Sequence, residues 1–202
     1  MQYNIKQDIK GLIFDLDGTL ADTLPYHYRA WQVACKKFGV SMNQKFLKKY
    51  TGNPTWVIAD KLLKENNLDG KISVEEITEE KMMAFYDEYQ KFVTPIEPVV
   101  DIVKRYYGKL PMAVGTGAQR LAAEKTLEII NMRQYFDIIV TANDVANFKP
   151  HPETFLKCAE IMNIEPRFIE VFEDGDLGIE SAIAAGMQVT DVRSWYDSNW
   201  WL

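Results

Sequence analysis

Five short apolar runs, each about the length of one β-strand, set the strongest limit on the fold of this chain. They are residues 12–14, 112–114, 137–140, 169–172 and 187–192, and each run after the first follows a stretch predicted to be helical. Strands that alternate with helices are typical of a parallel sheet with helices on both faces. We therefore expect an α/β fold with a doubly wound, Rossmann-like parallel sheet.

One long segment interrupts this alternation. Residues 24–94 show helical periodicity throughout, with a helix start at Pro54 and a capping-box pattern formed by Ser73 and Glu76. Loops at the ends of strands tolerate insertions well. We expect residues 22–94 to form an α-helical cap inserted after the first strand, and residues 1–21 and 95–202 to form the α/β catalytic core.

The composition narrows the list of partners and locations. The formal net charge is −6 and there is no basic stripe, which argues against a nucleic acid or an anionic membrane as a partner. No apolar run approaches the roughly 20 residues of a membrane span, and the first ten residues do not resemble a signal peptide. Cys35 and Cys158 form no CxxC motif and suit a reducing compartment. We expect a cytoplasmic protein; the sequence leaves the oligomeric state open, and we favour a monomer.

Polar side chains suited to catalysis or ligand binding follow four of the predicted strands. In open parallel sheets, ligands bind beyond the carboxyl ends of the strands, so these side chains are expected to meet at one edge. In chain order they are Asp15 and Asp17, then Thr116 and Gly117, then Lys149, and finally Glu173, Asp174 and Asp176.

These residue types together favour phosphoryl transfer. Clustered carboxylates repel one another and need a cation, and their hard oxygen atoms suit Mg²⁺. Thr116, beside Gly117 and near a helix start, can donate to phosphate oxygens, and Lys149 supplies a positive charge. Asp15 is then the candidate covalent nucleophile, and Asp17 the candidate acid and base.

Each of these residue groups, taken alone, also has an ordinary structural explanation. An Asp-Leu-Asp stretch is usually a turn, and a threonine after a strand is usually a helix cap. The run "GTGAQR" is not a dinucleotide fingerprint, because Arg120 stands where the third glycine belongs. The joint pattern, with one piece at each successive strand end, favours the catalytic interpretation.

The same stretches resemble the motifs of the haloacid dehalogenase superfamily across essentially the whole chain. "FDLDGTLADT" is similar to its first motif, and Thr116, Lys149 and "FEDGDLGIESAIAAGM" match the second, third and fourth. The helical insertion is similar to the first cap type of that superfamily. "YHYRAW" and the Glu173–Asp174 pair resemble the β-phosphoglucomutase-like branch, and "GNPTW" and "PMAVGTG" resemble bacterial phosphatases of fructose 1-phosphate.

This resemblance implies a role for each matching residue. Asp15 would be the nucleophile and a metal ligand, and Asp17 the acid and base, with its backbone carbonyl on Mg²⁺. The remaining assignments are phosphate binding by Thr116, Gly117 and Lys149, and metal binding by Glu173 and Asp174. His27 falls where the family places a histidine near the acid and base, although a helix-face histidine close to a hinge explains it equally well. Many relatives carry serine where Gly175 stands, and this departure removes no metal ligand.

Several other residues have two or more interpretations. Trp56 faces the substrate or packs inside the helical bundle, and His151 is expected to be a loop residue. Asp22 and Thr23 belong to the hinge at the start of the cap, or Asp22 is an N-cap. Three tryptophans in "SWYDSNWWL" pack on the sheet, form an oligomer contact or remain loose.

The predicted function is a Mg²⁺-dependent phosphatase of small phosphorylated metabolites, sugar phosphates such as fructose 1-phosphate, that acts through a phosphoaspartyl intermediate. The first alternative is a β-phosphoglucomutase-like sugar phosphomutase, which needs a site for a second phosphate, preferably an arginine. No arginine occurs between Arg29 and Arg105, so Lys48, Lys49 or Lys61 would have to substitute for it. The second alternative is an inactive binding module, against which the complete residue set argues. A dehalogenase is disfavoured, because that reaction needs neither Asp17 nor a metal.

Overall fold

The protein is built around a parallel sheet of five strands. The computed structural model describes residues 3–196, apart from the side chain of Tyr89. The strands pair in the order β3-β2-β1-β4-β5, and every pair is parallel. Their bounds are β1 (Gly11–Phe14), β2 (Met112–Gly115), β3 (Ile138–Val140), β4 (Ile169–Glu173) and β5 (Gln188–Asp191). All five apolar runs of the sequence are thus strands, as predicted.

Helices cover both faces of this sheet, because the central strands are apolar on both sides. Leu12 and Phe14 of β1 lie in the same buried cluster as residues of α5 (Glu97–Tyr106) and α6 (Arg120–Ile129). Ile13, which points the other way, packs with residues of α7 (Glu153–Met162) and α8 (Asp176–Ala184). Two short 3₁₀ turns, Arg133–Tyr135 and Pro166–Phe168, lead into β3 and β4. The predicted doubly wound α/β fold is confirmed.

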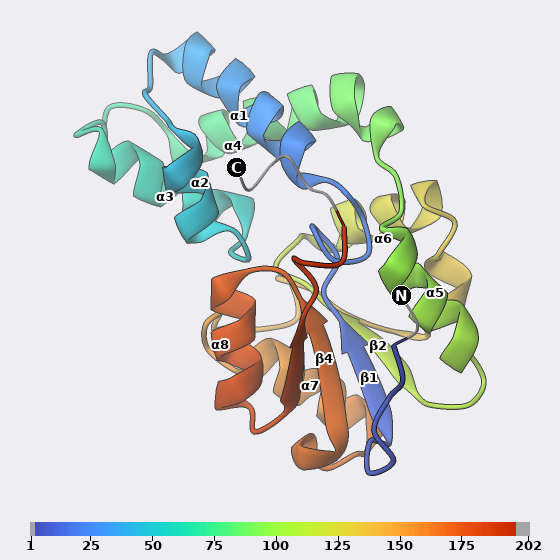
Figure 1. The fold of residues 1–202 in the computed structure, drawn as a ribbon. Helices are drawn as coiled ribbons and strands as arrows, with labels where there is room; N and C mark the ends of the chain where they lie inside the picture. Colours follow the sequence, from blue (N-terminus) through green and yellow to red (C-terminus); the bar gives the residue numbers. More distant parts are fainter. Residues whose placement is uncertain (1–2, 197–202) are drawn as a thin grey trace.

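The segment between β1 and α5 forms a separate group of helices, drawn above the carboxyl ends of the strands in Figure 1. These helices have a buried cluster of their own, which includes Trp31, Phe46 and Leu62. The Ser73 hydroxyl accepts from the N–H groups of Glu75 and Glu76, so the predicted helix start is present. The helices are α1 (Leu24–Phe38), α2 (Gln44–Tyr50), α3 (Thr55–Glu65) and α4 (Val74–Ala84), followed by a π-helical turn (Phe85–Tyr89) and a 3₁₀ turn (Gln90–Phe92).

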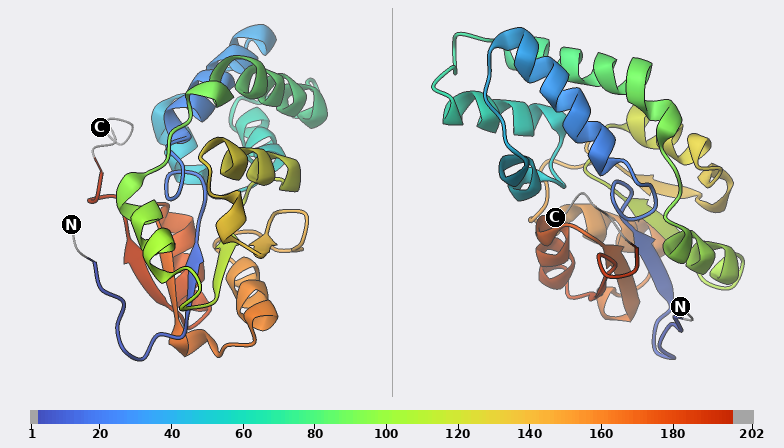
Figure 2. Two further views of the ribbon diagram at one scale, coloured as in Figure 1. Left: turned by 90° about the vertical axis from the view of Figure 1, so that its right-hand side faces the viewer. Right: turned by 45° about the horizontal axis from the view of Figure 1, so that its top comes forward.

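The chain passes between the sheet and these helices twice, at adjacent places (Figure 2). The Asp22 N–H donates to the Thr94 carbonyl at 2.9 Å, and the Ile96 N–H donates to the Leu20 carbonyl at 2.9 Å. The N-cap position of α1 belongs to Thr23 and not to Asp22. These paired bonds hold the two passages side by side.

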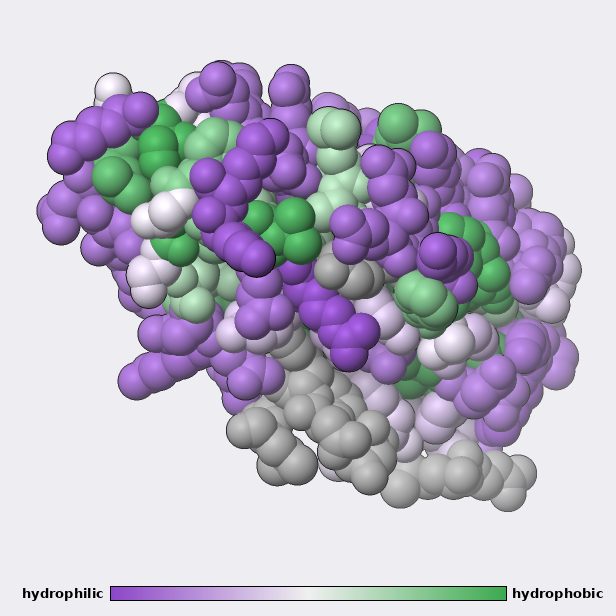
Figure 3. Space-filling model, turned by 90° about the horizontal axis from the view of Figure 1, so that it is seen from above, coloured by the Kyte–Doolittle hydropathy of each residue, from purple (hydrophilic) through white to green (hydrophobic). Residues whose placement is uncertain are grey.

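The outer surface contains no large apolar area on the side seen in Figure 3, where hydrophobic patches are small and separate. None of the helices within residues 3–196 is both long and apolar enough to cross a membrane. Of the three C-terminal tryptophans, Trp195 packs against Tyr3 and Phe172, with ring centroids 4.9 and 6.0 Å away. Trp200 and Trp201 lie outside the described residues.

Candidate active site

Three carboxylates meet beyond the ends of β1 and β4. Asp15, Glu173 and Asp174 each offer an oxygen atom, and these atoms lie within 4.8 Å of one another. All three side chains are buried. The parallel pairing of β1 with β4 produces this arrangement, since it places Phe14 opposite Phe172 and so brings both strand ends to one edge.

Lys149 lies between two of these carboxylates. Its Nζ donates to Asp15 Oδ1 and to Glu173 Oε2, both at 2.7 Å, and it stands 4.6 Å from the centre of the Phe155 ring. Burial alone would lower the pKa of Lys149, but the two carboxylates outweigh burial and raise it, so the lysine stays charged. The Lys149 ammonium neutralises part of the carboxylate charge in the absence of a metal.

The cluster still carries more negative charge than the side chains around it can balance. Burial and the neighbouring Glu173 raise the pKa of Asp15 to about 8, and the same two causes raise the pKa of Asp174 well above its usual value. Asp174 Oδ1 accepts from the Thr19 hydroxyl at 2.8 Å, whereas Oδ2 is buried without a hydrogen-bond partner among the described residues. An orphaned carboxylate oxygen among crowded acids fits a divalent cation with oxygen ligands, such as Mg²⁺.

Two glycines leave room for these carboxylates. A β-carbon at Gly178, in α8, would lie 1.9 Å from Glu173 Oε2, and one at Gly18 would lie 2.2 Å from Asp174 Oδ2. Gly18 also has φ +90°, a conformation that side chains rarely adopt. The Gly175 N–H donates to Glu173 Oε1 at 2.9 Å, so the glycine in place of serine still orients Glu173 through its backbone.

Asp17 is held by Thr23, the N-cap residue of α1, and by His27 of α1. Its Oδ1 accepts from the Thr23 hydroxyl at 2.7 Å and lies 3.3 Å from His27 Nε2. Burial would raise the pKa of Asp17, but the hydrogen bonds from His27 and Thr23 outweigh burial and lower it. The sequence left the place of His27 open, and the structure puts its ring against Asp17 and stacks it on Phe85, with centroids 4.1 Å apart.

A buried lysine that the sequence analysis did not single out extends this chain of contacts. Lys81 of α4 is 3% exposed, and its Nζ lies 3.0 Å from His27 Nδ1. Burial lowers the pKa of Lys81 to about 8, and burial together with the Lys81 charge lowers the pKa of His27. A neutral ring that accepts from Lys81 at Nδ1 and donates to Asp17 from Nε2 satisfies both contacts.

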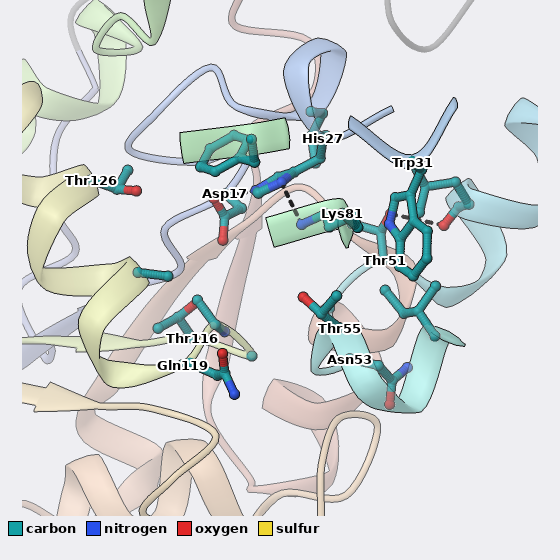
Figure 4. Close-up of a pocket in the computed structure, with 18 of the residues that line it drawn as sticks. Asp17, His27, Trp31, Thr51, Asn53, Thr55, Lys81, Thr116, Gln119 and Thr126 are labelled. Carbon is teal, nitrogen blue, oxygen red and sulfur yellow. Dashed lines mark hydrogen bonds and ion pairs between the residues drawn. The ribbon is translucent and has the colours of Figure 1, made fainter. Parts of the chain in front are cut away.

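A pocket lies between the carboxyl ends of the strands and the group of helices α1–α4, here called the cap, and is shown in Figure 4. Its volume is about 820 Å³, part of which is open to solvent. Asp15 and Thr116 lie on the core side, and His27, Trp31 and Lys81 on the cap side. The Thr116 hydroxyl accepts from the Ala118 N–H at 3.0 Å, which leaves its own hydrogen for a ligand.

The tip of the cap touches the core at the mouth of the pocket. A β-carbon at Gly117 would lie 2.2 Å from the Gly52 carbonyl oxygen, so a side chain at residue 117 would force the two loops apart. Trp56 meets Phe148 of the core edge-on, with ring centroids 5.7 Å apart. Neither interpretation of Trp56 given above matches this position, because its ring contacts the core and not the interior of the helical bundle.

Two further residues lie apart from the pocket. Asp176 forms an ion pair with Arg193 at 2.8 Å, and its side chain is largely exposed. His151 lies in the loop before α7, where its Nδ1 accepts from the Glu153 N–H at 3.3 Å. The loop position of His151 is the one expected from the sequence, and Asp176 lies at the surface.

Comparison with known proteins places the chain in a family. Residues 12–192 match the haloacid dehalogenase-like hydrolase family. A protein of Escherichia coli, "Fructose-1-phosphate phosphatase YqaB", is 42% identical over 183 residues, covering 91% of this chain and 96% of that protein. The "Phosphorylated carbohydrates phosphatase" of Thermotoga maritima is 32% identical and covers 89% of this chain and 83% of that protein.

A solved structure gives the same result at the level of the fold. The β-phosphoglucomutase of Clostridium difficile superposes with a TM-score of 0.77 at 28% identity, covering 96% of this chain and 93% of that one. The chain therefore belongs to the haloacid dehalogenase-like hydrolases, and its folded structure is similar to that of a β-phosphoglucomutase.

Proposed function

We propose that this protein is a Mg²⁺-dependent phosphatase of small sugar phosphates, with fructose 1-phosphate as the first substrate to test. The observation that carries the proposal is the pairing of Asp15 with Lys149, Glu173 and Asp174 at the floor of a pocket that the cap covers. The similarity to a fructose-1-phosphate phosphatase and to a phosphatase of phosphorylated carbohydrates supports the substrate class.

Asp15 acts as the nucleophile in this proposal. Its Oδ1 is held by Lys149, and its Oδ2 has no hydrogen-bond partner within residues 3–196, so Oδ2 is free to attack phosphorus and form a phosphoaspartate. Thr116, the Gly117 backbone and Lys149 hold the transferring phosphate. Mg²⁺ bound by Asp15, Glu173, Asp174 and the Asp17 carbonyl would neutralise charge on the phosphate oxygens.

Asp17 moves the protons. The lowered pKa of its carboxyl favours the ionised form, which accepts a proton from the water that hydrolyses the phosphoaspartate. In the first step the protonated form of Asp17 gives its proton to the departing sugar oxygen, and the proton that the carboxylate then takes from water in the second step restores the protonated form. His27, fixed between Asp17 and Lys81, orients this carboxylate from the cap side.

The phosphomutase alternative has less support in the pocket. Lys81 is the one cationic side chain among the described pocket-lining residues, and it is already in contact with His27. Lys48, Lys49 and Lys61 are not among the residues that line the pocket, so none of them takes the place of the missing arginine there. A second phosphate would therefore meet no arginine, and transfer to water is favoured over transfer to a bound sugar phosphate.

Release of inorganic phosphate tests the proposal. Purified protein with Mg²⁺ is expected to release phosphate from fructose 1-phosphate, and Asp15→Asn is the matched inactive control. With β-glucose 1-phosphate and a trace of the 1,6-bisphosphate, free phosphate should form faster than glucose 6-phosphate. The opposite order would make the protein a mutase, and no release from any ester would support the binding-module alternative.

We also propose that the chain is divided into a core domain and a cap domain. The adjacent passages at Ala21 and Pro95 and the separate apolar cluster of the cap support a core of residues 1–21 and 95–202 and a cap of residues 22–94. Cys35 and Cys158 are both buried free thiols, which supports a reducing, cytoplasmic location. A monomer without nucleic-acid or membrane partners remains part of the proposal.

A further inference from the structure

One wall of the pocket is a single face of helix α6. Gln119, Ala122 and Thr126 all line the pocket, and their spacing of three and four residues puts them on one side of the helix. A helix rises about 1.5 Å per residue, so Gln119 and Thr126 are about 10 Å apart along it. This wall begins next to Thr116 and Gly117, the proposed phosphate-binding residues, and it is long enough to line the whole length of a sugar phosphate.

Thr126 carries an unused polar group on that wall. The residue is 3% exposed, and Figure 4 shows its hydroxyl pointing from α6 toward the pocket. A helical threonine often donates to the carbonyl four residues earlier. No such bond is found for Thr126 among the described residues, and its hydroxyl faces the pocket, so it is open to a hydrogen bond from a ligand.

The surroundings of Thr126 indicate the chemistry of that ligand. Ala122, Phe85 and Leu24, which line the same pocket, are apolar, and Lys81, the cationic residue of the lining, is already in contact with His27. A neutral hydroxyl can both donate to and accept from another hydroxyl. A substrate with hydroxyl groups beyond its phosphate satisfies Thr126, whereas an alkyl phosphate leaves it unpaired.

We propose that Thr126 is a specificity-determining residue whose hydroxyl binds a hydroxyl group of the sugar. This inference rests on the proposed function, because it concerns the organic part of the phosphatase substrate. It gives the α6 wall of the pocket a means to select a polyhydroxylated ester over an alkyl ester of the same length. Polar sites of this kind reject analogues that lack the hydrogen-bonding group.

The test compares two substrates across three variants. We would measure kcat/KM for fructose 1-phosphate and for n-hexyl phosphate with wild type, Thr126→Val and Thr126→Ser. Valine keeps the shape and removes the hydroxyl, and serine keeps the hydroxyl. The preference for the sugar ester should fall about 3- to 10-fold in the valine variant, the range expected for one neutral hydrogen bond, and should persist in the serine variant.

Thr78→Val is the matched control. The Thr78 hydroxyl of α4 is buried without a partner among the described residues, but Thr78 does not line the pocket, so this change should leave the preference as it is. An unchanged preference in Thr126→Val, or an equal loss in Thr126→Ser, would overturn the subsite while the phosphatase stands. Failure of wild type to hydrolyse either ester would overturn both proposals. Melting temperatures show that each variant is folded.

Discussion

The core and the cap each bury one lysine in or beside the candidate site, and the two lysines have opposite electrostatic surroundings. Lys149 of the core contacts two carboxylates at 2.7 Å, and its pKa is raised. Lys81 of the cap contacts a neutral histidine, a methionine sulphur and aromatic faces, and its pKa is lowered to about 8. The nearest negative charge that favours its protonation is on Asp17.

This difference indicates that the two lysines have separate roles. Lys149 has both of its carboxylate partners within the core, so its contacts do not depend on the cap. Lys81 contacts His27 of the cap, and the charge that favours its protonation comes from Asp17 of the core. We infer that Lys149 stabilises the fold and the chemistry together, whereas Lys81 lowers stability and serves the substrate.

The largest expected effect is that of Lys149→Met. Removing one partner of a buried ion pair leaves uncompensated charge, so unfolding free energy in chelator should fall by about 3–5 kcal/mol. Phosphatase activity should fall about 100-fold or more, because a preorganised cation on the transferring phosphate is lost. Urea unfolding and single-substrate kinetics measure both. A more stable variant would contradict the view that the core lysine is well paired.

Lys81→Met should change stability in the opposite direction. Folding keeps the lysine in an environment that lowers its pKa from 10.5 to about 8, which costs up to about 3 kcal/mol while the side chain is protonated. The variant should therefore unfold at higher urea concentration than wild type at pH 7, while its activity on sugar phosphates falls.

The pH dependence of unfolding tests whether burial of the Lys81 charge causes the higher stability of Lys81→Met. Between about pH 8 and pH 10.5 the unfolded chain still binds the Lys81 proton and the folded chain does not, so wild type gains stability as pH rises. The advantage of Lys81→Met should shrink over that range. An advantage that stays constant with pH would show that packing, and not charge burial, is responsible.

These two lysines also show what the sequence predicts and what it does not. Lys149 follows a strand in a parallel sheet, and strand ends meet at one edge whatever else the chain does, so its position was predictable. Lys81 stands in "VEEITEEKMMA", which has the charge pattern of a solvated helix. The sequence nevertheless contains a signal that Lys81 is buried. Lys81 lies four residues after Ile77 and three before Ala84, which are both buried, and this spacing places it on the inner face of α4.

The same contrast holds for the fold. The five strands were predictable because buried parallel strands are continuous apolar runs, although the last run, 187–192, extends beyond β5 at Gln188–Asp191. The contacts between Gly117 and Gly52 and between Trp56 and Phe148 join residues far apart in the chain. No local pattern encodes them, because they depend on how the finished cap rests on the finished core.

Mg²⁺ binding should raise the free energy of unfolding by slightly less than the Lys81→Met substitution does. A ligand at one hundred times its Kd that binds only the folded chain stabilises it by about 2.7 kcal/mol. We expect that shift in wild type and in Lys81→Met, but not in Asp174→Asn, which removes a proposed ligand oxygen. Activity should be lost in chelator and restored poorly by Ca²⁺, which prefers more ligands at longer distances. An equal shift in Asp174→Asn would remove Asp174 from the metal site.

The smallest expected effect concerns the contact between the two halves. Trp56 and Phe148 meet edge-on across the cap–core boundary, and such aromatic pairs contribute about 0.5–1.5 kcal/mol beyond their buried area. A double-mutant cycle with Trp56→Leu and Phe148→Leu should show that coupling in kcat/KM for fructose 1-phosphate, because closure of the cap precedes catalysis.

Tyr107 and Tyr135 supply the control for this cycle. They form a similar edge-on pair, with centroids 5.0 Å apart at 80°, but both belong to the proposed core. Their coupling should appear in unfolding free energy and vanish in kcat/KM. If the Trp56–Phe148 pair behaved in the same way, the contact would be part of the fold alone, and the cap would not need it to close over a substrate.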